Sequence, residues 1–239
     1  KNVFNHVDYV FHMAAESRIQ SAIDNPIQAV QKNCVGTATM LQCAREAGVK
    51  RFVYSSTSSG YGNNPFPNVE TQPDDCLNPY SATKIAGEKL CKMYTNLYGL
   101  ETVVLRYFNV FGQRCPTRGQ YAPVIGIFRR QLASGEPLTI VGDGSQRRDF
   151  VHVNDVARAN YLASILPLQG HEGEVFNVGS GTNYSVQDIA NIISDNQVYL
   201  PERKGEMHTT LANIDKIGTV IGWKPEVDVM DWIKGEMNG

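Results

Sequence analysis

Short apolar runs alternate with stretches of helical periodicity along the first half of the chain. Residues 7–15 (VDYVFHMAA) are an apolar run too short for a full helix, which predicts a buried strand. Over residues 24–47, apolar side chains recur at helical spacing behind an Asp-Asn-Pro start, and Gly48 follows as a stop signal. This region therefore predicts one long helix after the first strand.

The same alternation continues as far as residue 107. The pattern predicts a strand over 51–55, a loop rich in Gly, Asn and Pro over 60–73, a helix over 78–98 and a strand over 101–107. Strands that alternate with long helices are typical of right-handed crossovers in a parallel sheet. We therefore predict an α/β fold with a doubly wound parallel sheet.

After this point the predicted elements become shorter. Helices are predicted near 124–133, 154–165, 186–194 and the C-terminus, with short strands in LTIV, DFVHV and EVFNVG. We expect residues 1–110 to form the doubly wound part and residues 111–239 to form mostly a smaller α/β cap. Segments around 149–178 are expected to return to the larger sheet.

Composition and charge exclude several classes of partner. The formal net charge of −2 gives no general attraction to nucleic acid or anionic lipid. No run of about 18 apolar residues predicts a membrane span, and the opening KNVFNHVDYV lacks the apolar core of a signal peptide. The histidines show no metal-ligand spacing, so no metal site is predicted. Five cysteines without a CxxC pair fit a reducing cytoplasm: Cys34, Cys43, Cys76, Cys91 and Cys115.

A glycine-rich turn is missing from this sequence. A dinucleotide-binding fold normally opens with a strand and a GxGxxG-like turn at a helix N-terminus. Gly36, Gly48, Gly60 and Gly62 do not follow a first strand with that spacing. Either no dinucleotide binds, or the sequence is an N-terminally truncated piece of such a fold.

Tyr80 and Lys84 are the first candidates for chemistry. Positions i and i+4 of a helix lie on one face, and these two open the helix predicted over 78–98. An ammonium close to a phenol favours the phenolate and lowers the pKa of the tyrosine, which makes it a usable general base or acid. The alternative is a surface tyrosine stacked on a lysine stem. The hydroxyl-rich stretch SSTSSGYG (55–62) before this helix favours the catalytic interpretation.

Four motifs in order resemble one enzyme family. They are the Ser/Thr stretch, YxxxK, LRYFNVFG (105–112) and GDGSQRRDFVHVNDVA (142–157). Together they are similar to the nucleotide-sugar epimerases and dehydratases of the extended short-chain dehydrogenase/reductase family. The resemblance covers nearly the whole chain, apart from the family's opening segment of roughly 60 residues with the glycine-rich turn. It implies a Rossmann-type sheet, bound NAD and a transient ketone at C4 of the sugar.

The resemblance also implies roles for individual residues. Tyr80 would be the general base, Lys84 its pKa partner and a contact of the nicotinamide ribose, and Thr57 the catalytic hydroxyl. The implied cofactor contacts are Ala14, Ala15, Asn33, Tyr80, Lys84, Tyr107 and Phe108. The implied substrate contacts are Thr57, Ser58, Asn109, Tyr121, Val124, Arg148, Arg203 and His208. The two arginines would pair with the diphosphate. His208 stands where such relatives usually have arginine, so it is either a phosphate contact or a plain surface histidine.

Ser58 and Ser59 distinguish between the reactions of this family. Related dehydratases place Asp-Glu directly after the catalytic threonine, and these acids carry out the elimination. Serine at neutral pH serves neither as a carboxylic acid nor as a carboxylate base. Proton and hydride exchange at C4 needs no acid beyond Tyr80 and Thr57, so the sequence predicts 4-epimerisation.

Several alternatives stay open. The substrate is expected to be UDP-GlcNAc/UDP-GalNAc or UDP-glucose/UDP-galactose, with uronates close behind. Another enzyme of the family, a 4,6-dehydratase or a reductase, and a non-catalytic nucleotide-binding relative are the rival interpretations. The resemblance further implies a homodimer through helices 26–47 and 79–98, although both helices would also serve simply to cover the sheet.

Overall fold

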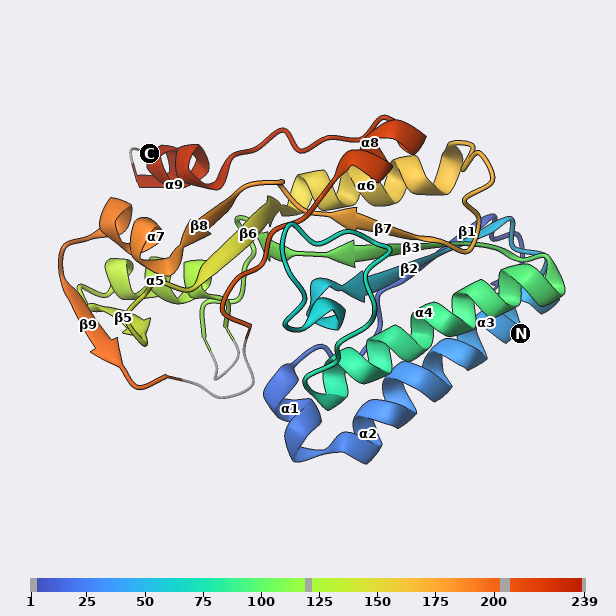
Figure 1. The fold of residues 1–239 in the computed structure, drawn as a ribbon, viewed down its shortest axis with the longest axis horizontal. Helices are drawn as coiled ribbons and strands as arrows, with labels where there is room; N and C mark the ends of the chain where they lie inside the picture. The colour runs from blue at the N-terminus through green and yellow to red at the C-terminus, as the bar shows by residue number, and fades with distance from the viewer. Residues whose placement is uncertain (1–3, 119–121, 203–206, 238–239) are drawn as a thin grey trace.

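The computed structural model describes residues 4–118, 122–202 and 207–237, and its centre is a four-stranded parallel sheet (Figure 1). The strand order is β1-β2-β3-β7. Its strands are β1 (Tyr9–His12), β2 (Arg51–Thr57), β3 (Glu101–Tyr107) and β7 (Val175–Val178). The register aligns Arg51 with Glu101 and Thr57 with Tyr107, so β2 and β3 end at the same edge. The predicted parallel sheet is confirmed.

Helices cover both faces of this sheet, as a doubly wound fold requires. One face carries α3 (Gly36–Glu46) and α4 (Pro79–Tyr98), and the other carries α6 (Val153–Ile165) and α8 (Asp215–Ile221). Before α3 lie α1 (Ile19–Asp24), α2 (Pro26–Val30) and a π-helical turn, η2 (Gln31–Val35). A short 3-10 helix, η3 (Ser58–Tyr61), follows β2 directly.

The smaller part holds two further sheets, shown at the left of Figure 1. One sheet has the order β4-β6-β8, from β4 (Asn109–Phe111), β6 (Arg147–His152) and β8 (Asn183–Ser185). The other pairs β5 (Leu138–Val141) with β9 (Gln197–Leu200) in parallel. Three helices pack around them: α5 (Val124–Ala133), α7 (Val186–Ile193) and α9 (Val229–Met237).

Local sequence signals explain why α4 begins and ends as predicted. Asn78 accepts a hydrogen bond from the backbone N–H of Ser81 at 2.9 Å, and the Ser81 hydroxyl completes a capping box. Pro79 occupies the first helical position, where its missing N–H costs nothing. Gly99 ends the helix with a left-handed φ of 70°. Gly87 lets α4 approach β2, because a Cβ there would overlap the Tyr54 hydroxyl.

The structure corrects several details of the predicted elements. The single helix predicted over 24–47 is interrupted by the π-helical turn, and α1 precedes it as a separate helix. Of the segment predicted to return to the larger sheet, β7 does so, whereas β6 pairs with β4 and β8 instead. The strands β4 and β8 have three residues each, and β9 is largely exposed, so none of them carries a clear apolar pattern.

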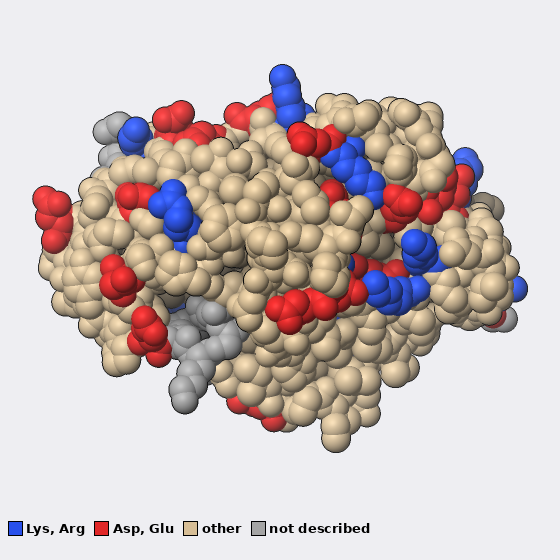
Figure 2. Space-filling model, viewed as in Figure 1, with Lys and Arg blue, Asp and Glu red and all other residues tan. Residues whose placement is uncertain are grey.

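The surface gives no sign of a single-sign charged patch on the face shown in Figure 2, where basic and acidic side chains are interspersed. Among the described residues, no helix is both long and apolar enough to span a membrane. The largest apolar core lies between the sheet and α6 and includes Val53, Leu105, Phe176 and Trp223.

His12 is buried on β1, and its environment makes the fold sensitive to acid. Its Nε2 atom lies 3.0 Å from the Thr37 hydroxyl oxygen, and only 4% of the residue is exposed. Burial, with the positive charge of Lys84, lowers the pKa of His12 to about 4. The unfolded chain, with an ordinary histidine pKa of about 6.5, therefore binds a proton in a pH range where the folded chain does not.

We predict that this difference destabilises the protein as pH falls from about 6.5 towards 4. Between about pH 7.5 and pH 5, His12 should account for a loss of about 2 kcal/mol in the free energy of unfolding. His12→Gln keeps a hydrogen-bonding side chain but does not titrate, so its loss should be smaller by that amount. Urea denaturation of both proteins at the two pH values measures this; equal losses would contradict the prediction.

Candidate active site

Thr57 and Tyr80 meet at the carboxyl end of the parallel sheet. Thr57 is the last residue of β2, and Tyr80 lies in the first turn of α4. The Thr57 hydroxyl oxygen accepts a hydrogen bond from the backbone N–H of Ser59 at 3.1 Å. Burial raises the pKa of Tyr80, while the nearby Thr57 side chain and the positive charge of Arg18 oppose that rise.

Lys84 lies one turn after Tyr80, but its ammonium is directed elsewhere. The Nζ atom lies 4.3 Å from the centre of the Tyr54 ring, and the residue is only 3% exposed. Burial lowers the pKa of Lys84 to about 8. The sequence prediction that Lys84 lowers the pKa of Tyr80 toward neutrality is not met in the protein alone, because burial dominates and the opposing cation is Arg18.

A buried ion pair fixes α4 against the sheet just beyond these residues. Arg106 on β3 donates to both carboxylate oxygens of Glu88 on α4, at 2.8 and 2.7 Å. Ser56 on β2 donates to the same carboxylate, and Arg106 also reaches Asp74 at 3.0 Å. Both side chains of the main pair are 2% exposed. The pair therefore links α4, β2 and β3 one turn after Lys84.

Asn33 connects the loop after β1 to the same helix. Its Oδ1 accepts from the backbone N–H of Glu16 at 2.7 Å, and its Nδ2 donates to the Glu16 carbonyl at 3.0 Å. Nδ2 also donates to the Thr83 hydroxyl at 2.9 Å. Ala14 and Ala15 lie in this loop, where Ala14 is exposed and Ala15 half-buried. Asn33 thus holds the loop against α4, and its predicted place at the NAD site remains a prediction.

Tyr107 and Phe108 both contact neighbouring side chains. The Tyr107 hydroxyl lies 3.0 Å from that of Ser55 and donates to Asn160 of α6 at 2.9 Å. Phe108 is buried against Tyr61, with ring centres 6.3 Å apart. The predicted contacts of these two residues with the nicotinamide remain predictions.

A cavity of about 700 Å³ opens beside the Thr57–Tyr80 pair. Four predicted substrate contacts line it: Ser58, Asn109, Val124 and Arg148. Its described walls include neither Thr57, Tyr80 nor Lys84, so the cavity begins at the next residue, Ser58. Its size is ordinary for a small-molecule site. Tyr121 and Arg203 lie outside the described residues. We refer to this space as the candidate cavity.

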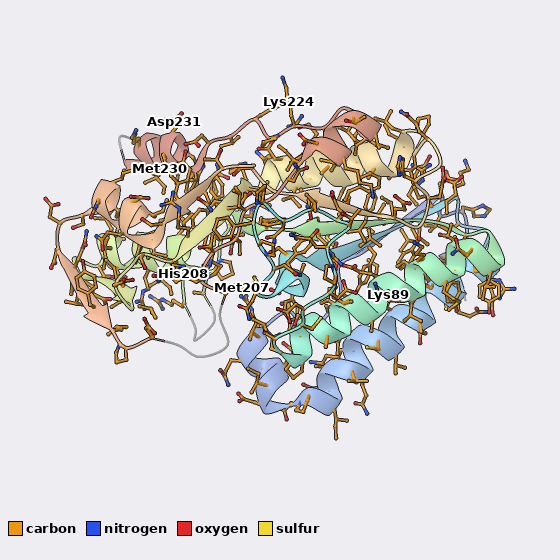
Figure 3. All side chains as sticks on the ribbon, viewed as in Figure 1. Lys89, Met207, His208, Lys224, Met230 and Asp231 are labelled. Carbon is orange, nitrogen blue, oxygen red and sulfur yellow. The ribbon has the colours of Figure 1, made fainter. Side chains whose placement is uncertain are left out.

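Arg148 contacts the main chain of His208, and the predicted phosphate contacts of both residues remain predictions. Arg148 Nη1 donates to the main-chain carbonyl of His208 at 2.9 Å. The His208 ring is exposed and hydrogen-bonds to the side chains of Ser145 and Thr209, at 3.2 Å each. Met207 lines the candidate cavity, and Figure 3 labels both residues where the smaller part faces α1. The backbone of His208, rather than its ring, is what orients Arg148.

Sequence reasoning missed several lining residues. They include Ser17, Arg18, Gln20, Gln146 and Thr210. Ser17 and Arg18 carry a signal in the sequence, because they lie in the loop after β1 and ligands bind outside the carboxyl ends of parallel strands. Gln146 and Thr210 have no comparable signal, because only the tertiary fold brings β6 and the segment after Met207 together.

Comparison with known proteins places the chain in a family. A profile of the NAD dependent epimerase/dehydratase family matches residues 1–179. The UDP-glucose 4-epimerase of Mycolicibacterium smegmatis is 34% identical over 234 residues, which cover 95% of this chain and 74% of that protein. The chain belongs to the NAD-dependent epimerase/dehydratase family.

Solved structures agree with this assignment. The UDP-N-acetylglucosamine 4-epimerase of Methanobrevibacter ruminantium, solved with UDP-N-acetylmuramic acid, superposes with a TM-score of 0.91 at 33% identity and covers 98% of this chain and 76% of its own. The UDP-glucuronic acid 4-epimerase of Bacillus cereus, solved with UDP-glucuronic acid and NAD, gives 0.89 at 30% identity, with 99% and 76% covered.

The residues present fit the nicotinamide end of NAD. Lys84 is only 3% exposed, and its ammonium contacts the Tyr54 ring rather than a described carboxylate. The ammonium can donate hydrogen bonds, and ribose hydroxyls would supply acceptors. Lys84 would hold the ribose, and the adjacent Thr57–Tyr80 pair would face the reacting carbon.

We predict that Glu88→Ala destabilises the protein by about 3–5 kcal/mol, because it leaves the buried Arg106 guanidinium without its carboxylate. Lys89, labelled in Figure 3, is the matched control, since its ion pair with Asp74 involves a side chain 67% exposed. Lys89→Ala should cost less than about 1 kcal/mol. Urea denaturation measures both variants, and similar losses would contradict the role given to the buried pair.

Proposed function

We propose that this protein catalyses NAD-dependent 4-epimerisation of a UDP-sugar, through a transient 4-keto sugar. The observation that supports it best is the placement of Thr57 close to Tyr80, beside a cavity whose next wall residues are Ser58 and Ser59. The proposed substrates are UDP-GlcNAc/UDP-GalNAc or UDP-glucose/UDP-galactose. The similarity to 4-epimerases acting on several UDP-sugars supports the class of reaction.

In the proposed reaction, Tyr80 removes the proton from the sugar 4-hydroxyl, directly or through Thr57, and later returns it. Bound NAD supplies the acceptance and return of hydride at C4. Because burial raises the pKa of Tyr80, its phenolate depends on nearby positive charge, which Arg18 supplies. The small Ser59 side chain lines the candidate cavity and would leave room for an N-acetyl group on the sugar.

The two residues after Thr57 also disfavour elimination of water from the sugar. A dehydratase needs a carboxylic acid and a carboxylate beside the threonine, and the two positions after Thr57 are Ser58 and Ser59. Both serines line the candidate cavity, so no acid from this helix reaches the sugar. The reductase and non-catalytic alternatives have no observation in their favour.

We further propose which part of the chain binds the cofactor and which part binds the substrate. Residues 1–110 would form the cofactor side, with Ala14, Ala15, Asn33, Tyr107 and Phe108 near NAD. Residues 111–239 would form mostly the nucleotide-sugar side, with Val124 and Arg148 at the substrate, and Asn109 of the first part would join them there. Five free cysteines support a reducing cytoplasmic location.

Tyr80→Phe should lower kcat by at least about 100-fold, because it removes the group that exchanges the proton. Tyr161→Phe is the control, since Tyr161 is exposed on α6. Proton NMR of each variant with NAD and each proposed UDP-sugar detects the anomeric signal of the C4 epimer. Unchanged turnover in Tyr80→Phe would overturn the role of Tyr80, and a 4-keto-6-deoxy product from the wild type would overturn the proposed reaction.

We also propose a homodimer formed through two helical stretches, residues 26–47 and 79–98. Large apolar side chains are exposed along this surface: Ile27, Val30, Val35, Leu97 and Tyr98. Ile27 is 75% exposed, which is unusual for an isoleucine without a partner. An apolar stripe of this length is typical of a protein interface.

If this surface forms the dimer, Ile27→Glu should weaken dimerisation by at least about tenfold, because it buries a carboxylate without a partner. Gln28→Glu adds the same charge at the neighbouring exposed position and should have a smaller effect. Light scattering across a dilution series gives the molecular mass of each variant. A wild-type monomer, or a dimer unaffected by Ile27→Glu, would contradict the proposed interface.

A further inference from the structure

The charged side chains that the described residues contribute to the candidate cavity are of one sign. Its described walls contain two charged side chains, Arg18 and Arg148, and no aspartate, glutamate, lysine or histidine. Arg18 belongs to the loop between β1 and α1, whereas Arg148 belongs to β6. The two cations therefore enter from different parts of the fold. A cavity of this kind attracts anionic ligands and disfavours cationic ones.

We propose that Arg18 binds an anionic oxygen group of the bound nucleotide sugar, from the sheet side of the candidate cavity, while Arg148 acts from the side of the smaller sheets. This rests on the proposed function, since it takes the ligand to be a UDP-sugar. Arginine suits the task because its planar guanidinium can donate two parallel hydrogen bonds to a phosphate or a carboxylate.

The backbone that carries Arg18 is held firmly. Asn33 binds both the N–H and the carbonyl of Glu16, two residues earlier, and ties them to Thr83 of α4. The Arg18 carbonyl accepts from the N–H of Ala22 at 3.0 Å, in the first turn of α1. A residue on a preorganised backbone loses less entropy when it binds a ligand.

Glu16 is the acid of the same loop, and its carboxylate lies 3.2 Å from the Lys32 ammonium. Burial raises the pKa of Glu16, but the Lys32 ammonium, the Ser21 side chain and the backbone of Arg18 outweigh it and hold this pKa below its ordinary value. Glu16 is absent from the described walls of the candidate cavity.

Arg18 lies at the reacting end of the cavity. Its charge lowers the pKa of Tyr80 on α4 and that of Cys115 in the loop after β4, so it lies within electrostatic range of both. Ser58 and Ser59 line the same cavity with hydroxyl groups. Two anionic groups of a nucleotide sugar suit this position: the diphosphate, and the C6 carboxylate of a hexuronate.

Isothermal titration of UDP, UDP-glucose and UDP-glucuronate into the full chain separates these two sources. If Arg18 binds the diphosphate, Arg18→Gln should lower the affinity for all three ligands by about 10- to 100-fold. If it binds the carboxylate, only the affinity for UDP-glucuronate should fall by that factor. Arg18→Lys keeps the charge but loses the planar donor pair, and should fall between wild type and Arg18→Gln.

Arg45→Gln serves as the charge-matched control, because Arg45 is exposed on α3 and does not line the cavity. Thermal melts of all variants establish that they are folded. Wild-type affinity of Arg18→Gln for all three ligands, or equal losses in Arg45→Gln, would overturn the proposal. UDP cannot be epimerised, so its binding reports on Arg18 independently of catalysis. If UDP binding depends on Arg18 but no UDP-sugar is epimerised, the proposed function is overturned and the role of Arg18 in binding the anion still stands.

Discussion

The buried ion pair between Glu88 and Arg106 is the constraint on which the candidate site depends. It joins α4 to β3 by two short hydrogen bonds, and Ser56 extends it to β2. Tyr80 lies two turns before Glu88 on α4, and Thr57 lies next to Ser56. Any displacement of α4 along the sheet would therefore separate the Tyr80 phenol from the Thr57 hydroxyl. A fully buried charge pair adds little net stability, but it tolerates only one register.

Asp149 plays the corresponding part for the other wall of the candidate cavity. Its fully buried carboxylate accepts hydrogen bonds from the backbone N–H groups of Ser180, Gly181 and Ala212 at 2.6–3.1 Å. Burial raises the pKa of Asp149, and these bonds oppose that rise. Its carbonyl accepts from the Asn109 amide at 3.0 Å. Arg148 is the preceding residue, so its backbone is fixed by the same contacts.

The sequence predicts those parts of the fold and site that depend on local signals. The helix 79–98 was predictable because its capping residues and its terminal Gly99 are neighbours in the chain. The π-helical turn at 31–35 and the exposed strand β9 carry no such signal. In the site, Tyr80 and Thr57 follow from motifs. The direction of the Lys84 ammonium and the role of the His208 carbonyl depend on tertiary contacts, which a motif does not encode.

The absence of acidic residues directly after Thr57 also affects the charge of the candidate cavity. With Ser58 and Ser59 in the wall, the only charges that the described residues contribute to the cavity are Arg18 and Arg148. An aspartate or glutamate at those positions would provide the acid–base pair for elimination, and would also stand beside Arg18 and partly neutralise it. In the proposed reaction, the serines would therefore act in two ways. They would replace the groups that expel water from a keto sugar, and they would add no negative charge beside Arg18, which favours both the Tyr80 phenolate and an anionic ligand.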